Sequence, residues 1–318
     1  MEKYMIVLAV LADLIIGKTS SKKYADVMIG RVAVMLEERL WNENDTPIKQ
    51  RKKGVILVSG TILFGYAAAI ALAVALLILG PWWYFLGSII VVAFLIMPRS
   101  LSEITYEIGR ALREGNLIEA RRSLAAIIDH DTDMMGREEL LRAAIDAIAD
   151  KLVRNVISPL FYFLLGGFPL AVMYYTANMI SSLYSTQNEK YAEFGYAVEK
   201  LSEVFNYIPA RITALLTVAA SFVLRYDTKH SVMMIRRDSN KYPSPNGGYT
   251  EAAIAGALNI RLGGTIRLNG KEQAREYIGD AVEQISEEHI EKAIRLLYTV
   301  VILFCLIGVV IKIMGGGI

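Results

Sequence analysis

The sequence predicts an all-α fold, built as a polytopic integral membrane helical protein. Hydrophobic residues make up 54% of the 318 residues, and the mean hydropathy is +0.38. Of the 34 basic and 32 acidic residues, only Asp13, Arg211 and Lys312 fall within long apolar stretches. No run of useful length alternates apolar and polar residues as a strand does, whereas several follow helical spacing. We therefore expect about four to five membrane segments joined by amphipathic helices.

The composition also excludes several classes of protein. A net charge of +2 provides no general basic field for phosphates, so no nucleic-acid partner is expected. A single cysteine, Cys305, rules out a disulfide framework and a cysteine-based metal site. Three scattered histidines argue against a zinc enzyme. The lipid bilayer is the first partner that the sequence implies.

Three membrane elements are predicted in the first hundred residues. Residues 5–16 are short for a span and lack the basic start and cleavage site of a removable signal peptide, so we expect a retained membrane element. Residues 55–79 are long enough to cross a bilayer and carry no charge. Residues 82–97 are equally uncharged, so the two form a predicted hairpin with interfacial aromatic residues at its turn.

Three further apolar runs follow. Residues 156–175 contain two prolines and the pair Gly166-Gly167, which predicts a broken or re-entrant helix. Residues 208–224 form a weaker run. Residues 297–314 are a strong span in which Lys312 can extend toward the interface.

Basic residues in the loops predict the orientation. Residues 18–53 hold nine lysines and arginines, 98–155 hold nine and 225–296 hold eleven, whereas the turn at 80–84 holds none. By the positive-inside rule we expect these three segments, the main loops, to be cytoplasmic parts of one membrane domain spanning 1–318. The protein is thus expected in the cell membrane as a multi-pass protein. The side of residues 176–207 stays open.

The most unusual loop runs from Arg236 to Glu251. Its prolines and glycines predict a rigid exposed loop, and Arg236 and Arg237 suit bidentate binding of phosphate or carboxylate. We expect a helix after it, with Thr250 as N-cap and Gly263 as C-terminal cap, and with small residues that allow close helix contact. A tight connector between two helices explains the pattern about equally well.

Two other features carry charge in unusual places. Asp13 and Arg211 are costly in hydrocarbon, and we expect them to face each other or a polar cavity. Asp131, with Asp129 and Asp133, follows a helix end. This cluster suits Mg²⁺ with water and substrate phosphates, although a solvated turn is the commoner origin of such a pattern.

Several stretches, in the same order along the chain, resemble the adenosylcobinamide-phosphate synthase family of cobalamin biosynthesis. They include Ser158-Pro159-Leu160-Phe161-Tyr162 followed by Gly166-Gly167, and Asn206-Tyr207-Ile208-Pro209-Ala210-Arg211. A third runs from Arg236-Arg237-Asp238 through the Pro-Ser-Pro-Asn and Glu-Ala-Ala stretches to Arg261-Leu262-Gly263-Gly264. Ordered agreement of this kind is more specific than any single motif.

The resemblance implies ATP-dependent amide ligation of adenosylcobyric acid with aminopropanol phosphate, giving adenosylcobinamide phosphate. It implies ATP and Mg²⁺ as cofactors, the corrinoid and aminopropanol phosphate as substrates, and other corrinoid-pathway proteins as partners. The implied catalytic residues are Asp238, Glu251 and Asp131, of which Asp131 and Asp238 would bind the metal. The implied substrate-binding residues are Arg236, Arg237, Ser244, Asn246, Arg261, Asn206 and Arg211.

The chain also departs from the family pattern. Where the family usually has Glu-Asn-x-x-Asp-Gly, this chain has Asp150-Lys151-Leu152-Val153-Arg154-Asn155. Ser202-Glu203 replaces a usual Asp-Asp pair, so carboxylates are lost. By this resemblance the chain is a divergent member of the family. Besides a ligase, a non-catalytic membrane paralogue acting as scaffold or sensor fits the sequence, and a transporter is a weaker third.

Overall fold

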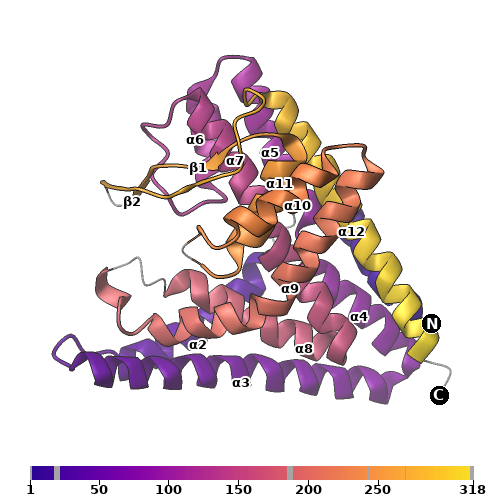
Figure 1. Cartoon of the computed structure of the whole chain (residues 1–318). Helices are drawn as coiled ribbons and strands as arrows, with labels where there is room; N and C mark the ends of the chain where they lie inside the picture. The colour runs from indigo at the N-terminus through magenta and orange to yellow at the C-terminus, as the bar shows by residue number, and fades with distance from the viewer. Residues whose placement is uncertain (1, 18–21, 185–188, 243, 269, 316–318) are drawn as a thin grey trace. The chain divides into compact units, whose positions relative to one another are not determined.

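The computed structural model describes residues 2–17, 22–184, 189–242, 244–268 and 270–315 (Figure 1). Helices dominate these ranges, which confirms the all-α prediction. The chain divides into two compact units. Unit 1 combines Met1–Met97, Ser158–Asn206 and Gly308–Ile318, and unit 2 combines Pro98–Ile157 and Tyr207–Ile307.

Unit 1 contains the long helix α3, Pro47–Leu79 (Figure 1). Leu57, Val58 and Ile62 of α3 are buried against Ala177 and Ile180. In the most apolar 18-residue part of α3, only 22% of the residues are buried inside the protein. Most of the hydrophobic surface of this helix is therefore available to lipid. The other helices of the unit are α1 (Met5–Ile16), α2 (Lys22–Leu40), α4 (Pro81–Leu95), α8 (Ser158–Leu183) and the first part of α9 (Tyr196–Val223).

Glycines shape two connections of unit 1 as the sequence predicts. Gly80 separates α3 from α4 with φ +125°, a conformation that L-residues rarely adopt. Inside α8 the backbone is non-helical at Gly166 and at Gly167, where φ is +70°. The predicted break in this helix is therefore confirmed.

Within the described ranges five helical stretches have the length and composition to cross a membrane, and Met5–Ile16 is a shorter apolar helix. The five are Pro47–Leu79, Pro81–Arg113, Arg137–Leu183, Tyr196–Val223 and Glu287–Gly315. Each predicted apolar stretch lies in one of these helices, so the polytopic membrane class is confirmed.

Unit 2 brings together segments that are far apart in the sequence. Its helices are α5 (Pro98–Arg113), α6 (Leu117–Ala125), α7 (Arg137–Leu152), the second part of α9, α10 (Thr228–Asp238), α11 (Gly247–Leu258) and most of α12 (Glu287–Gly315). A π-helical turn, Val153–Ile157, follows α7. The two large basic segments 98–155 and 225–296 both belong to this unit.

Close packing of α10 on α11 confirms the role expected for small residues. A Cβ atom on Gly256 would lie 2.6 Å from the His230 carbonyl oxygen and from the Ser231 Cα. The Ser231 hydroxyl donates to the Ala253 carbonyl at 2.8 Å and ties the helices together. Only glycine fits at this crossing.

The predicted ends of α11 were wrong. The helix begins a turn earlier, at Gly247 with Asn246 as N-cap, because Gly247 and Gly248 let the chain pass close to Tyr242 and Ser239. Thr250 is therefore inside the helix. The C-cap is Asn259, which is left-handed with φ 56°. Asparagine adopts this conformation readily.

Short strands follow α11. β1 (Leu262–Gly263) pairs antiparallel with β4 (Tyr277–Ile278), and β2 (Ile266–Leu268) pairs with β3 (Lys271–Gln273). Gly263 thus lies in β1 and not at a helix end, with φ +75°. Strands of two or three residues are too short to show an alternating pattern in the sequence.

Candidate functional site

The Asp238 carboxylate anchors the loop that follows α10. Its Oδ1 accepts from Arg237 Nε at 2.7 Å and lies 2.8 Å from Lys241 Nζ, and its Oδ2 accepts from Arg237 Nη2 and the Gly279 N–H, each at 2.8 Å. Asp238 is fully buried. Burial alone would raise the pKa of Asp238, but the hydrogen bonds from Arg237, Lys241 and Gly279 hold it well below the ordinary value. Asp238 is therefore a charged anchor whose oxygens are already occupied.

A second carboxylate extends this network. Arg237 also donates to Asp280, at 3.0 Å and 2.9 Å, and this hydrogen bond lowers the pKa of Asp280. His230 Nε2 lies 3.2 Å from Asp280, and its Nδ1 lies 2.5 Å from the Asn259 side-chain oxygen. The network joins α10, the end of α11 and the segment after β4.

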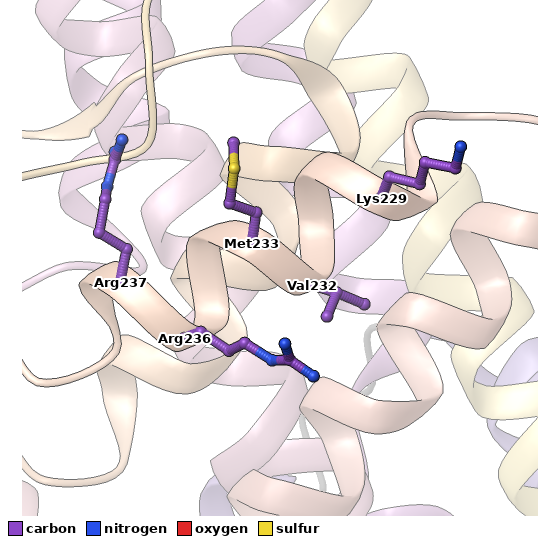
Figure 2. A pocket seen from close by; sticks show the side chains of 5 residues that line it. All are labelled: Lys229, Val232, Met233, Arg236 and Arg237. Atoms are coloured by element: carbon purple, nitrogen blue, oxygen red, sulfur yellow. The ribbon is translucent and has the colours of Figure 1, made fainter.

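Basic residues line a pocket on the exposed face of α10. Lys229, Val232, Met233, Arg236 and Arg237 form its lining, and none of them is acidic (Figure 2). Figure 2 shows Arg236 and Arg237 extending in different directions from the helix. Among the described residues Lys229 and Arg236 pair with no carboxylate, whereas Arg237 holds two. Of the two arginines predicted to bind phosphate, Arg236 is the one whose donors are available.

Ionisable residues also gather around Glu251 on α11. The Glu251 side chain is buried and is hydrogen-bonded to Tyr242, which is in turn hydrogen-bonded to Arg275. Asp146 of α7 is a charged neighbour of Glu251, and its carboxyl is hydrogen-bonded by the Gly263 N–H. Glu251 Oε2 and Asp146 Oδ1 are buried without a hydrogen-bond partner. We call Asp146, Tyr242, Glu251 and Arg275 the carboxyl cluster.

The electrostatics of the carboxyl cluster follow from burial. Burial, and then the negative charge of Asp146, raise the pKa of Glu251 well above its ordinary value. Burial and Glu251 also raise the pKa of Tyr242. Burial lowers the pKa of Arg275, but the nearby Tyr242 and Glu251 have the larger combined effect, and the pKa of Arg275 is raised. Glu251 therefore holds a proton more tightly than an exposed glutamate does, and it lies near a permanent cation.

Local sequence explains how Tyr242 reaches Glu251. A Cβ atom on Gly247 would lie 2.7 Å from the Tyr242 ring, and one on Gly248 would lie 2.1 Å from the Ser239 carbonyl oxygen. The two glycines therefore allow the ring to lie against the first turn of α11. This contact is a reason for the Gly-Gly pair that is independent of helix capping.

Arg211 and Asn246, two of the predicted substrate-binding residues, meet in unit 2. Arg211 Nη1 donates to the Tyr207 carbonyl at 2.7 Å and to the Asn246 side-chain oxygen at 3.3 Å. The guanidinium also lies over the Tyr207 and Tyr249 rings, 3.4 Å and 4.4 Å from their centroids. Asp13 is buried in unit 1, and its pairing with Arg211 stays a prediction.

The other predicted site residues have separate surroundings. Asn206 belongs to unit 1, where its oxygen accepts from Ser158 and Tyr174, each at 2.8 Å. Asp131 accepts from the Gly270 N–H at 2.7 Å and fixes the β2–β3 hairpin. The remaining two, Ser244 and Arg261, contact the Asn246 N–H and the Tyr277 ring respectively.

The predicted metal ligands do not form a ready-made cation site. Asp238 is occupied by nitrogen donors and Asp131 by a backbone amide. In the part of the chain that the structure describes, no three His, Cys, Asp or Glu side chains converge as metal ligands would.

Several site residues were not singled out by sequence reasoning. Asp146, Tyr242, Arg275, Asp280 and Lys229 carry no motif of their own. The one available signal was the spacing of Asp146 and Asp150, which puts two acids on neighbouring turns of one helix face, in the same row as Glu138 and Arg142. Asp280 depends on its contact with Arg237 across 43 residues of sequence.

The fold is that of a multi-pass helical membrane protein. Its unit 2 contains a group of buried ionisable residues and an exposed basic pocket. A sequence model of the family described as CobD/Cbib protein matches residues 6–297. The chain belongs to this family of cobalamin biosynthesis proteins.

Relatives agree along nearly the whole chain. A cobalamin biosynthesis protein CobD from Clostridium perfringens is 34% identical over 313 residues, covering 96% of this chain and 97% of the relative. The protein of that name from Halalkalibacterium halodurans is 34% identical over 304 residues, covering 94% and 93%. The one from Leptospira interrogans is 31% identical over 295 residues, covering 92% of each. No solved structure matches the chain.

Proposed function

We propose that this chain is a membrane-bound ligase that joins adenosylcobyric acid to aminopropanol phosphate, with ATP hydrolysis, to give adenosylcobinamide phosphate. The observation that carries the proposal is the full-length similarity to relatives named cobalamin biosynthesis protein CobD. Amide formation from a carboxylate requires that the acid be activated and that the amine be free of its proton. The proposed co-reactants are ATP and Mg²⁺, with the ion entering together with the nucleotide phosphates.

The basic pocket on α10 supplies the phosphate-binding part of the proposal. Lys229 and Arg236 offer cationic donors beside the apolar side chains of Val232 and Met233 (Figure 2). Such a surface suits a phosphate that is carried on a small organic group. Arg237 and Asp238 then act indirectly, because their ion pair fixes the end of α10 and so the direction of Arg236.

The carboxyl cluster supplies the proton-accepting part. Glu251 is buried next to a second carboxyl, and its raised pKa makes it a better base than an exposed glutamate. Tyr242 is hydrogen-bonded to the Glu251 carboxyl and is itself hydrogen-bonded to Arg275, so the two residues keep that carboxyl in place. Glu251 is the residue in this unit best suited to accept a proton from an amine.

One observation favours the alternative of a non-catalytic membrane scaffold or sensor. Asp150 starts the stretch in which the family pattern usually has two acids, and here Arg154 takes the second acidic position. Arg154 Nε lies 2.8 Å from Asp150, and Lys151 lies 3.5 Å from it. An internal ion pair thus occupies carboxylate oxygens that a divalent cation would otherwise need.

The two functions predict different results with purified protein in detergent. The chain is incubated with ATP, Mg²⁺, adenosylcobyric acid and aminopropanol phosphate, and the amide product is measured by mass spectrometry. A ligase forms the product, and Arg236→Ala and Glu251→Gln lower the rate at least tenfold. Binding of the corrinoid without any amide supports the scaffold or sensor.

Complementation tests the same proposal in cells. A strain that lacks this step and is fed cobyric acid should grow when it expresses this chain. Growth that persists unchanged with Glu251→Gln would contradict the role given to that side chain. Growth unchanged by Arg237→Ala and Asp238→Ala would show that the ion pair is not needed to position α10.

A further inference from the structure

The carboxyl cluster contains two acceptor atoms that the folded chain leaves unsatisfied. Glu251 Oε2 and Asp146 Oδ1 are both buried and have no hydrogen-bond donor in the described structure. The Glu251 side chain is only 1% exposed. Arg142 Nε and Thr250 Oγ1 are buried without a partner as well. Buried polar atoms are normally paired, and an unpaired one is costly, so a cluster with this many open polar atoms favours a ligand that supplies donors to its carboxylates.

The charges of the surrounding residues indicate the kind of group that is missing. Asp150 is neutralised by Arg154 and Lys151, and Arg142 is paired with Glu138. Among the described residues Arg275 is the cation that acts on both Asp146 and Glu251, and Arg142, which also acts on Asp146, is held by Glu138. One further positive charge that carries N–H donors would balance the two carboxylates.

An ammonium group matches these requirements better than a metal ion does. It carries a single positive charge and three donors, enough for both open carboxylate oxygens. A divalent cation prefers six or more oxygen ligands, and the described residues place no three metal-ligating side chains together. The Asp146 side chain is partly exposed, so the cluster lies near the surface of the unit, although the open Oδ1 atom itself is covered.

We propose that Asp146 and Glu251 form the subsite for the ammonium group of the amine substrate. Each carboxylate accepts an N–H from the ammonium, and Tyr242 and Arg275 hold Glu251 in position. A proton then moves from the ammonium nitrogen to a Glu251 carboxylate oxygen, which leaves a neutral amine with its lone pair free. The inference rests on the proposed ligase function and adds Asp146 as a substrate-binding residue.

Ligand binding without turnover tests the subsite. Purified protein in detergent is titrated by calorimetry with aminopropanol phosphate and with propanediol phosphate, in which a hydroxyl replaces the amine. We expect the wild-type chain to bind the amine at least about tenfold more tightly, because charge-assisted hydrogen bonds are the strong ones. Glu251→Gln and Asp146→Asn should each remove this difference. Glu272→Gln, which changes an exposed carboxylate on β3, should keep it.

Three results would overturn the inference. The first is equal affinity of the wild-type chain for both probes, and the second is amine preference retained in both variants. The third is loss of Mn²⁺ binding in the variants, measured by electron paramagnetic resonance, with the amine preference unchanged. Thermal stability of each variant shows that it is folded. Because Asp146 is half-buried, Asp146→Asn provides a second readout if Glu251→Gln is poorly folded.

The binding test and the ligase assay fail independently. If the wild-type chain prefers the amine but forms no amide, the subsite stands and the ligase proposal fails. If amide forms and both variants keep the wild-type KM for the amine, the ligase proposal stands and the subsite fails. In an active ligase, Glu251→Gln should also abolish the dependence of kcat/KM for the amine on the ionisation of this carboxyl.

Discussion

Asp238 is the most strongly held charge among the site residues. All of its carboxylate contacts are to nitrogen donors, and the side chain is fully buried. Asp238→Asn removes the charge that Arg237 and Lys241 need, and we expect it to cost about 3 kcal/mol of unfolding free energy. Chemical unfolding in mixed micelles, followed by circular dichroism, measures this loss.

Asp280 is the matched control for Asp238, since it binds the same arginine. Its side chain is 41% exposed. Ion pairs in that position contribute about 0–1 kcal/mol, so Asp280→Asn should lower stability much less. Equal losses for the two variants would contradict the view that burial makes Asp238 the anchor.

Glu251 should make the stability of the ligand-free protein depend on pH. In the folded protein the pKa of Glu251 lies above the ordinary value of 4.5 because burial and the charges of Asp146 and Asp150 raise it. Arg275 and Tyr242 lower this pKa, but by less. Below pH 4.5 both states hold the proton. Above it the unfolded state loses the proton first, so this contribution to stability falls as pH rises toward the folded pKa.

Glu251→Gln removes that ionisation. The variant should therefore gain stability relative to the wild-type chain as pH rises from 4.5, by up to about 1.4 kcal/mol per pH unit. Unfolding in mixed micelles at pH 4.5 and pH 8 measures the gain, with Glu272→Gln as the exposed control. A stability difference that stays constant with pH would show that Glu251 ionises normally in the folded chain.

At the scale of residues, the sequence identified the stretch around Arg236 and Arg237 but not the side chains that bind these arginines. Arg236 and Arg237 look equivalent in the sequence, yet consecutive helical residues point about 100° apart. Arg237 is held by its neighbour Asp238 and also by Asp280, which lies 43 residues further along the chain. Spacing within the motif contains no information about that contact.

At the scale of elements, the crossing of α10 and α11 should be sensitive to a single methyl group. A Cβ at Gly256 would lie 2.6 Å from backbone atoms of α10, which cannot move as a flexible side chain does. Gly256→Ala should therefore destabilise the protein by about 1–3 kcal/mol through overpacking. The free energy of unfolding and the amide-forming rate should fall together.

Gly30 in α2 offers the matched glycine. A Cβ there meets only the Met179 side-chain end, at an ordinary 3.7 Å. Gly30→Ala should leave the stability unchanged or raise it by up to about 1 kcal/mol through helix propensity. A similar loss in both variants would mean that the tight crossing is not the cause.

Elements that are governed by local chemistry could be predicted from the sequence. The break in α8 follows from Gly166-Gly167, and the turn before α4 from Gly80, because these backbones need glycine. The start of α11 could not be predicted, since it depends on Tyr242 packing against Gly247. The short strands depend on pairing with partners up to sixteen residues away.

At the scale of the whole molecule, the membrane class followed from composition, whereas the carboxyl cluster did not. Apolar length is a property of each segment alone, so every long apolar helix was identifiable. Asp146, Glu251 and Arg275 meet only because α7, α11 and the segment after β3 belong to one compact unit. Such a meeting is a result of tertiary packing, which sequence periodicity does not encode.

The segregation of basic residues leads to a prediction about topology. Residues 225–296 hold eleven lysines and arginines and the turn at 80–84 holds none, so the two should face opposite sides of the membrane. Single cysteines at Trp83, which is 58% exposed, and at Glu272, also exposed, can report this in a Cys305→Ala background. In intact cells a membrane-impermeant maleimide should label Trp83→Cys, and Glu272→Cys only after permeabilisation. The reverse pattern would place the basic pocket and the carboxyl cluster outside the cytoplasm, away from any supply of ATP, and would contradict the ligase proposal.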